Sequence, residues 1–359
     1  MIKKHLMIRG KKRKKIYKYI IIILLYLIIN IMIRKKLKKI GIIGMKHSQN
    51  IGNNLLKYAI YIKLSEFGFE PFIIGKKQKN SNISFILNAV RVRLINKSFN
   101  EIKENDYDIL VVNSDLTWTK QEDFYNIAFL NFSKDWNITK FVYGASLGDK
   151  NWKFTKEEDK IIKPLIKNFN GISVRENCSI KLIESHLGFK PELVLDPTFL
   201  IDKKYYLNLI KNFKVVNTIE KSFIFIYTLT HSKEFKMLIK NIVEKYNYKI
   251  YLIDTKVINQ IQKFIYGIYK SKAVITDSYH GTVFSIIFNK PFISFVDKKR
   301  GYERFNNLKE IFNINNRIYF QNSSPNINLL EIPLKINKKN LKTLKKKSIH
   351  FLKANLFFS

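Results

Sequence analysis

The sequence predicts an α/β protein with two largely parallel sheets. Short apolar runs of the kind that form buried strands alternate along the chain with segments of helical periodicity. Strands that alternate with helices tend to pair in parallel, because a parallel connection has to cross over the sheet. The alternation stops at Asp202–Thr218, which has no strand pattern, and then starts again. We therefore expect one sheet before this segment and a second sheet after it.

The strands are expected where runs rich in β-branched and aromatic residues lie between polar or glycine residues. In the first sheet these runs are Ile40–Gly44, Glu70–Ile74, Asp108–Asn113, Phe141–Ser146, Gly171–Arg175 and Glu192–Leu195. In the second sheet they are Ser222–Thr228, Lys249–Ile253, Lys272–Thr276 and Pro291–Val296. Helical spacing of apolar residues predicts helices at Asn54–Phe67, Lys156–Phe169, Ser179–Leu187, His231–Tyr246, Val257–Ser271 and Asn340–Leu356.

These patterns divide the chain into four parts. Residues 1–37 are a basic arm and a hydrophobic segment, 38–205 a first domain, 206–330 a second domain, and 331–359 a basic helical tail. One helical face of the tail carries the apolar residues Leu341, Leu344, Ile349, Leu352 and Leu356. A stripe of this kind is typical of a helix that packs against a domain.

The hydrophobic segment Tyr19–Ile33 predicts attachment to a membrane. It is apolar except for Asn30 and lies between two basic stretches. As a helix it would be roughly 22 Å long, short of a hydrocarbon core of about 30 Å. A shallow or re-entrant anchor is therefore expected at least as much as a full span, and the basic flanks leave its orientation open. In an alternative interpretation, translation starts at Met32 and there is no anchor.

Composition narrows the classes of function. The formal net charge is +37, but residues 1–39 and 332–359 contain many basic residues and no acidic one. No nucleic-acid motif accompanies these ends, so an anionic membrane surface or a solvated face is the better explanation. The single cysteine, Cys178, excludes an intramolecular disulfide, and the six histidines show no metal-ligand spacing. Gly41 and Gly44 do not match the dinucleotide-binding fingerprint. We expect neither a metal nor a nicotinamide cofactor.

The strongest functional signal is Lys272–Phe295, which places His280 between a strand and the start of a helix. Ligands of α/β proteins bind at the carboxyl ends of strands, and the first turn of a helix attracts anions. Histidine titrates near neutral pH and suits acid–base chemistry. We therefore predict His280 as a catalytic residue, with Ser278, Gly281 and Thr282 binding the substrate. The alternative is a structural histidine at the junction.

Polar residues at the ends of other strands extend this predicted site. These further candidates are Asn50, Gly52, Asn53, Ser114, Asp115, Trp118, Ser146, Arg175 and Arg300. Arginine can pair bidentately with phosphate or carboxylate, and tryptophan can stack on a sugar ring. Structural roles stay open for all of them. The asparagines could form a turn and helix cap, Asp115 and Trp118 a packed loop, and Arg175 a surface ion pair.

These segments together resemble the polysaccharide pyruvyl transferase family. The matching stretches are, in order, KKIGIIGMKHSQNIGNNLLKYAI, DILVVNSDLTW, FVYGASLG, GISVRENCSIKLI, ELVLDPTFL and KAVITDSYHGTVFSIIFNKPFI. They cover roughly residues 38–310, and SVRE, LDPTFL and TDSYHG are the most specific. The resemblance implies two Rossmann-like domains arranged as in GT-B glycosyltransferases, with the active site in the cleft between them.

The resemblance also implies an activity. The enolpyruvyl unit of phosphoenolpyruvate would be transferred to two hydroxyls of a free or lipid-linked glycan, giving a ketal in cell-surface polysaccharide. His280 would be the acid/base and Arg175 would bind the anionic donor, with no further cofactor. Some members have an arginine two places before the motif histidine, where this chain has Ser278. Arg300 or Arg304 is expected to make that contact instead.

Phosphoenolpyruvate is a cytoplasmic metabolite, so the resemblance implies work at the cytoplasmic face of the membrane, or in the cytoplasm if translation starts at Met32. Two other classes of function stay open. A nucleotide-sugar-dependent glycosyltransferase would use the same cleft, histidine and basic contacts. A non-catalytic, membrane-associated protein of glycan assembly would use only the basic ends of the chain.

Overall fold

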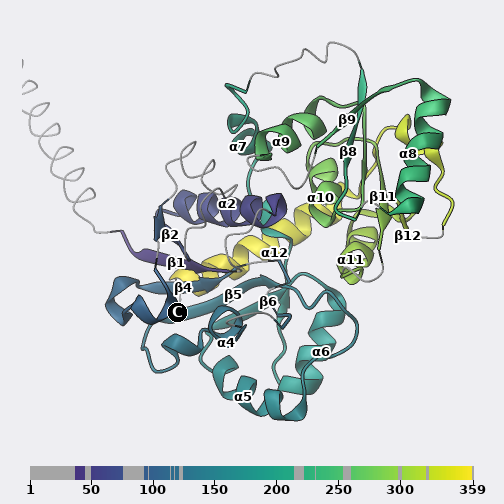
Figure 1. Ribbon diagram of the computed structural model, residues 1–359. Helices are drawn as coiled ribbons and strands as arrows, with labels where there is room; N and C mark the ends of the chain where they lie inside the picture. Colours follow the sequence, from purple (N-terminus) through teal and green to yellow (C-terminus); the bar gives the residue numbers. More distant parts are fainter. Residues whose placement is uncertain are drawn as a thin grey trace, which may run out of the picture. The chain divides into compact units, whose positions relative to one another are not determined.

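The computed structural model describes residues 37–44, 50–75, 93–95, 97–113, 115–116, 118–120, 124–213, 222–230, 232–253, 260–297, 301–320 and 323–357 (Figure 1). The predicted anchor Tyr19–Ile33 and the predicted site residues Ser114 and Arg300 lie outside these ranges. Residues 39–359 form one compact unit with two sheets. Within the described ranges, no helix combines the length and the apolar character needed to cross a membrane.

The first sheet has seven parallel strands in the order β3-β2-β1-β4-β5-β6-β7 (Figure 1). Their bounds are β1 Lys39–Ile43, β2 Glu70–Ile74, β3 Leu94–Ile95, β4 Ile109–Val112, β5 Thr139–Ala145, β6 Gly171–Val174 and β7 Glu192–Leu193. The chain moves outward from β1 in one direction and from β4 in the other. Ligand sites of doubly wound sheets lie at such a reversal, beyond the carboxyl ends of the two central strands.

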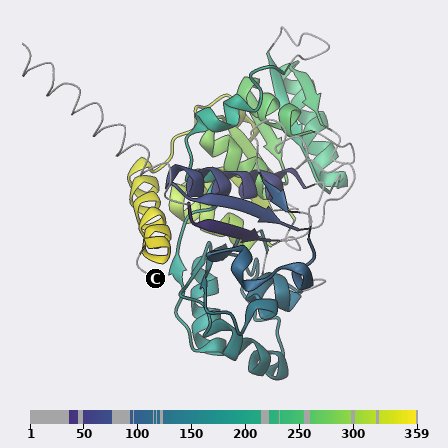
Figure 2. The same cartoon turned by 90° about the vertical axis from the view of Figure 1, so that its left-hand side faces the viewer.

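Helices cover both faces of the first sheet (Figures 1 and 2). One face packs against α2 (Ile51–Glu66) and α12 (Lys338–Phe357). The other face packs against α4 (Phe124–Phe129), α5 (Lys156–Ile166) and α6 (Asn177–Leu187). The alternation of side chains along each strand supplies both cores: on β4, Val111 faces the first core, and Leu110 and Val112 face the second.

The second sheet has five parallel strands in the order β12-β11-β10-β8-β9. Their bounds are β8 Phe223–Tyr227, β9 Lys249–Leu252, β10 Ala273–Thr276, β11 Phe292–Val296 and β12 Ile318–Phe320. Helix α8 (Lys233–Tyr246) covers one face. The other face packs against α9 (Ile261–Lys270), α10 (Tyr279–Ile287) and α11 (Glu303–Phe312). Their buried side chains belong to the same hydrophobic cluster as those of α2.

The predicted α/β fold with parallel sheets is confirmed, and each predicted strand differs from the observed one by at most two residues at either end. Helix α2 begins earlier than predicted, at Ile51. The reason is the side chain of Asn50, which accepts a hydrogen bond from the Asn53 N–H at 3.2 Å and caps the helix. Helix α7 (Lys203–Asn208), α11, β3 and β12 were not predicted, because they are short or largely polar.

The C-terminal helix α12 packs against the first sheet, although it follows the second in sequence (Figure 2). The ring of Phe351 lies 6.3 Å from that of Phe141 and 6.1 Å from that of Tyr143, both on β5. The hydroxyl of Ser348 accepts a hydrogen bond from the Leu195 N–H at 2.9 Å. Of the predicted apolar stripe, Leu352 and Leu356 are buried in the same core and the other three residues pack against it, so its packing is confirmed. The domain limits at residues 205 and 330 stay predictions.

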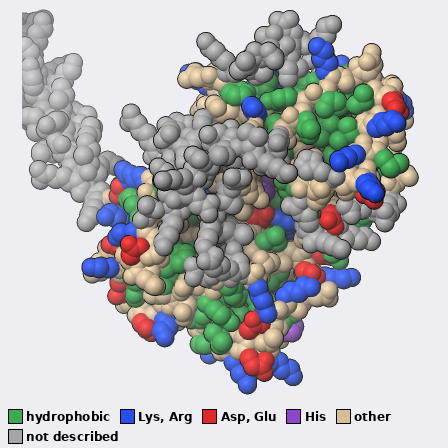
Figure 3. Space-filling model, viewed as in Figure 1, with side chains coloured by type: hydrophobic (Ala, Val, Ile, Leu, Met, Phe, Trp, Pro, Cys, Tyr) green, Lys and Arg blue, Asp and Glu red, His purple; other side chains and the backbone are tan. Residues whose placement is uncertain are grey.

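The visible surface is charged but mixed. On the face seen in Figure 3, basic and acidic side chains lie among each other and among apolar ones. Interspersed charges of both signs are typical of a solvated surface. The described part of this face therefore gives no sign of a single large basic patch.

Candidate functional site

Residues from both sheets line a cavity of about 290 Å³. The first sheet contributes Asn50, Asp115 and Leu116, and the second contributes Leu229, Asp277, Ser278, Tyr279, His280, Arg304 and Phe305. These residues lie in loops or helices that follow β1, β4, β8, β10 and β11. The cavity therefore lies beyond the carboxyl ends of strands, where the sequence predicts the site.

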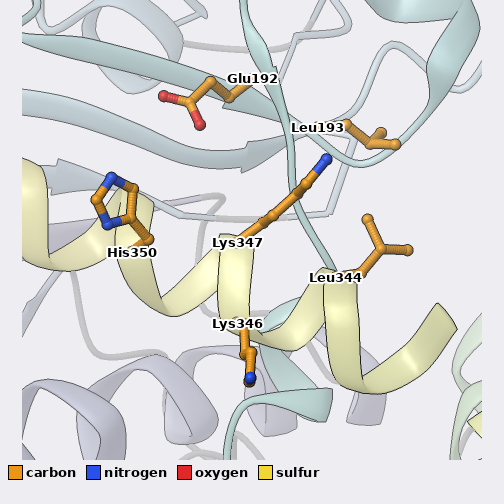
Figure 4. A pocket seen from close by; sticks show the side chains of 6 residues that line it. All are labelled: Glu192, Leu193, Leu344, Lys346, Lys347 and His350. Atoms are coloured by element: carbon orange, nitrogen blue, oxygen red, sulfur yellow. The ribbon is translucent and has the colours of Figure 1, made fainter. Parts of the chain in front are cut away.

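A larger groove of about 520 Å³ lies between the edge strand β7 and α12 (Figure 4). Its charged side chains, Glu192, Lys346, Lys347 and His350, are all exposed. Figure 4 shows Lys346 pointing away from Glu192, so the charges do not converge on one point. Functional sites usually have a few buried polar side chains that point toward the same place. The smaller cavity has such side chains and is therefore the better candidate.

The junction of β10 and α10 places His280. The hydroxyl of Ser278 caps α10 and accepts from the Gly281 N–H at 3.4 Å. The hydroxyl of Thr276 donates to the Tyr227 carbonyl at 2.6 Å and accepts from the Ser278 N–H at 3.0 Å. A Cβ at Gly281 would lie 2.3 Å from the Thr276 hydroxyl oxygen, so only glycine fits there. The predicted placement of His280 between strand and helix is confirmed.

The imidazole of His280 is almost completely buried. Its Nε2 atom has no hydrogen-bond partner among the described residues and lies 3.7 Å from Oδ2 of Asp196. Burial lowers the pKa of His280, and the nearby carboxylates of Asp196 and Asp115 partly oppose this shift. We therefore expect a neutral imidazole at neutral pH, the form that can accept a proton.

Gly52 provides the space that this imidazole occupies. A Cβ at Gly52 would lie 2.1 Å from Nδ1 of His280. The first turn of α2, which belongs to the first sheet, thus lies directly against a residue of the second sheet. Glycine is otherwise unfavourable inside a helix, so its presence in α2 is explained by this close approach.

Replacing Gly52 with alanine is expected to destabilise the protein by roughly 1–3 kcal/mol, because the added methyl group displaces the imidazole of His280. In an unobstructed helix the same change stabilises by about 1 kcal/mol. Denaturant unfolding measures the sign and the size of the effect. A variant as stable as the wild type would show that His280 does not occupy this position.

Two arginines and two aspartates form a buried ion network beside the cavity. Arg175, which follows β6, donates to Asp196 and, at 2.6 Å, to Asp115. Arg304 on α11 donates to both carboxylate oxygens of Asp115 at 2.6 Å. Burial alone would raise the pKa of Asp115, but Arg304 and Arg175 hold it well below its usual range. The Asp115–Arg304 pair joins the loop after β4 to the second sheet.

The ring of Tyr279 lies against both arginines of this network. The guanidinium carbon of Arg304 is 4.9 Å from the ring centroid and that of Arg175 is 5.5 Å from it. The ring of Phe305 meets Tyr279 edge-on. Cation–π contacts of this kind favour the charged guanidinium in a partly desolvated place. Tyr279 therefore helps to hold Arg304 at the cavity wall.

The structure brings some of the predicted site residues to the cavity and leaves others behind it. Asn50, Asp115, Ser278 and His280 line the cavity. Arg175 is buried behind the wall with its charge paired to Asp115 and Asp196. Its direct contact with a donor stays a prediction.

Several other predicted residues have structural contacts. The Thr282 hydroxyl shares a hydrogen bond of 2.5 Å with Ser294 and so joins α10 to β11. Trp118 is buried against Phe129, and its backbone N–H donates to the carbonyl of Ser146 at 3.3 Å. Asn53 lies in the capped first turn of α2. Roles of these residues in substrate binding stay predictions, as do those of Ser114 and Arg300.

Asp196 is a residue of the site that was not predicted from the sequence, and it caps the short helix that follows it. Arg304, which the resemblance names with Arg300 for the contact missing at Ser278, lines the cavity. The position of Asp196 at a strand end, within LDPTFL, is a signal that could have identified it. In the described part of the chain, no group of three or more His, Cys, Asp or Glu residues is arranged to hold a metal ion.

A family model described as polysaccharide pyruvyl transferase matches residues 50–298. The matched range begins at the cap of α2 and includes Asp115, Arg175, Asp196 and His280. No curated relative matches the sequence.

Solved structures share the fold. A protein assigned as UDP-N-acetylglucosamine 2-epimerase from Listeria monocytogenes aligns with a TM-score of 0.56 at 12% identity, covering 90% of this chain and 98% of its own. The UDP-GlcNAc 2-epimerase of Neisseria meningitidis, bound to UDP-GlcNAc, aligns with a TM-score of 0.52 at 13% identity, covering 88% and 99%. These proteins are GT-B-like, so the predicted two-sheet arrangement is supported at the level of the fold.

Proposed function

The chain belongs to the polysaccharide pyruvyl transferase family, and we propose that it transfers pyruvate from phosphoenolpyruvate to two hydroxyls of a glycan. The observation that carries this proposal is the position of His280, which lines the same cavity as Arg304. A neutral imidazole can move protons, and a guanidinium can bind the carboxylate or the phosphate of the donor.

The reaction needs proton transfer and anion binding. A proton adds to the methylene carbon of phosphoenolpyruvate, and the first glycan hydroxyl adds to the neighbouring carbon and loses its proton. The bond from that carbon to the phosphate oxygen then breaks, and phosphate leaves with the electron pair. The second hydroxyl adds to the same carbon and loses its proton, which closes the ketal. One of the two released protons balances the proton added to carbon, and the other goes to the leaving phosphate.

The residues of the cavity can be assigned to these needs. His280 would take a proton from an attacking hydroxyl and return it to the donor. Arg304 would bind one anionic group of the donor, and the capped first turn of α10, at Ser278, would lie near another. The described network contains as many carboxylates as guanidinium groups, so it has no net positive charge to offer an anionic donor. Arg300, outside the described residues, is therefore proposed as a further cation for so anionic a donor.

Incubation with labelled phosphoenolpyruvate and a panel of free and lipid-linked glycans tests the proposal. Release of phosphate is expected only when a suitable acceptor is present, with equal incorporation of label into the glycan. Protein with His280 replaced by alanine is the matched control and should release almost none. Transfer of a sugar from a nucleotide sugar, with no use of phosphoenolpyruvate, would contradict the proposal.

A nucleotide-sugar-dependent glycosyltransferase is the second candidate. A structure of the same fold holds UDP-GlcNAc, although the likeness extends to the fold alone. Calorimetric titration of phosphoenolpyruvate and of UDP-GlcNAc against the same protein distinguishes the two. Full biological activity of a His280→Ala variant would instead favour a non-catalytic role in glycan assembly.

We also propose that residues 1–37 tether the enzyme to the cytoplasmic face of the membrane. The basis is Tyr19–Ile33 with its basic flanks. Full-length protein is expected to stay with the membrane fraction after a high-salt wash, and a version that starts at Met32 is the control. Release by salt alone would indicate surface adhesion, and a natural N-terminus at Met32 would eliminate the tether. Cleavage of the catalytic part by protease outside intact cells would contradict the cytoplasmic location.

A further inference from the structure

We propose that Asp196 is a positioning residue for His280, holding Nε2–H of the ring toward its carboxylate so that Nδ1 is the nitrogen that exchanges protons with the substrate. This inference rests on the proposed function only in its last step. The first step, the orientation of the ring and the choice of protonated nitrogen, concerns the folded protein alone.

The carboxylate of Asp196 is itself held firmly in place. Its Oδ1 accepts from the backbone N–H of Thr198 at 2.9 Å and from the Thr198 hydroxyl at 2.6 Å. Its Oδ2 accepts from the guanidinium of Arg175, and the same oxygen lies 3.7 Å from Nε2 of His280. Both side chains of the Asp196–Arg175 ion pair are buried. Asp196 therefore presents a fixed negative charge to one edge of the imidazole.

The two nitrogens of His280 lie in different surroundings. Nε2 is fully buried and forms no hydrogen bond within the described part of the chain, and the carboxylate oxygen of Asp196 is an acceptor beside it. Nδ1 lies against Gly52 in the first turn of α2, two residues from Asn50, which lines the cavity. The position of the proton follows from this geometry: a hydrogen on Nε2 faces a negative charge, and Nδ1 keeps its lone pair.

This arrangement would assist the proposed chemistry. When Nδ1 accepts a proton, the imidazolium carries its second N–H toward Asp196. Asp196 and Asp115 stabilise that charge, whereas Arg175 and Arg304 and the burial of the ring oppose it. In the same way, an aspartate next to the catalytic histidine of a Ser-His-Asp triad fixes the tautomer of the histidine and stabilises its charged ring. Here the aspartate comes from the first sheet and the histidine from the second.

Nitrogen NMR of the full-length protein with labelled histidine tests the first step without any substrate. The His280 signal, identified by its loss in a His280→Gln variant, is expected to show Nε2–H in the neutral form. In Asp196→Asn the pKa of His280 is expected to fall, because the charge that favours the imidazolium is removed. Asp202→Asn is the matched control, because Asp202 also caps a helix, accepting from the Lys204 N–H at 2.8 Å. It should leave the His280 titration unchanged.

Steady-state phosphate release tests the last step. Asp196→Asn is expected to lower kcat on the order of 10- to 1000-fold with a much smaller change in KM. The lower limb of the pH–rate profile should move in the same direction as the His280 titration.

The outcomes distinguish the positioning role of Asp196 from the proposed pyruvyl transfer. An unchanged His280 titration in folded Asp196→Asn would overturn the positioning role. If that variant does not fold, a wild-type signal showing Nδ1–H in the neutral ring would overturn it equally. A shifted titration in a protein that never uses phosphoenolpyruvate would support the positioning role and reject the proposed function.

Discussion

Replacing His280 with alanine is expected to lower turnover by on the order of 10²–10⁴ while the fold is retained. The imidazole lines the cavity, and burial favours its neutral form. Its removal takes away the group that moves protons between the glycan hydroxyls and the donor. Phosphate release in the presence of an acceptor glycan measures the effect, and circular dichroism with thermal unfolding checks the fold.

His350 provides the matched control for this variant. It lies exposed on α12, so His350→Ala should leave turnover unchanged. A decrease of less than about threefold in the His280→Ala variant would remove His280 from the mechanism, because proton transfer by a positioned side chain contributes far more than that.

The pH dependence of the wild type follows from the same residue. Because the pKa of His280 is lowered from its ordinary value, the neutral base persists below the pH at which a free histidine becomes charged. The value of kcat/KM is therefore expected to hold as the pH falls to 6.5 and to decrease only below it. The free energy of unfolding is also expected to decrease as the pH falls. The unfolded chain binds the proton more readily, so this contribution to stability is complete above that pH and is lost on acidification.

Replacing Arg175 with alanine is expected to destabilise the protein by about 3–5 kcal/mol. The guanidinium is buried and pairs with Asp115 and Asp196, so its removal leaves the carboxylate of Asp196 buried without an opposite charge beside it. A buried pair that loses one partner costs far more than a surface pair, because the remaining charge keeps its desolvation penalty. Urea unfolding followed by fluorescence measures the change.

Arg93→Ala is the control for this prediction, because Arg93 is exposed and forms a surface ion pair with Glu70. Its effect should stay within roughly 1 kcal/mol. An equally small effect for Arg175→Ala would show that the network does not stabilise the fold. Arg175→Lys keeps the charge and loses the planar fork, so donor affinity is expected to fall. A fall in affinity without any loss of stability would assign Arg175 a direct contact with the donor.

Local sequence patterns were sufficient to predict most strands and helices of the fold. Runs of β-branched residues such as Ile109–Val112 form strands, and the helices between them make the strands parallel. The same local signal located His280, because a polar cluster that ends a buried strand lies at the edge of the sheet where ligands bind. Where local signals were weak the predictions missed the element: α11 is largely polar, and β3 has two residues.

Only the tertiary structure decided which distant residues surround His280. Gly52 comes from the first turn of α2, Asp115 and Asp196 come from the segments after β4 and β7, and Arg304 comes from α11. The return of α12 to the first sheet was likewise decided by packing, through the contact of Phe351 with β5. Periodicity reports which face of an element is apolar, whereas contacts between elements depend on how those faces pack together. The sequence by itself therefore determined the strands, the helices and the catalytic candidate, and tertiary packing determined the ion network beside that candidate.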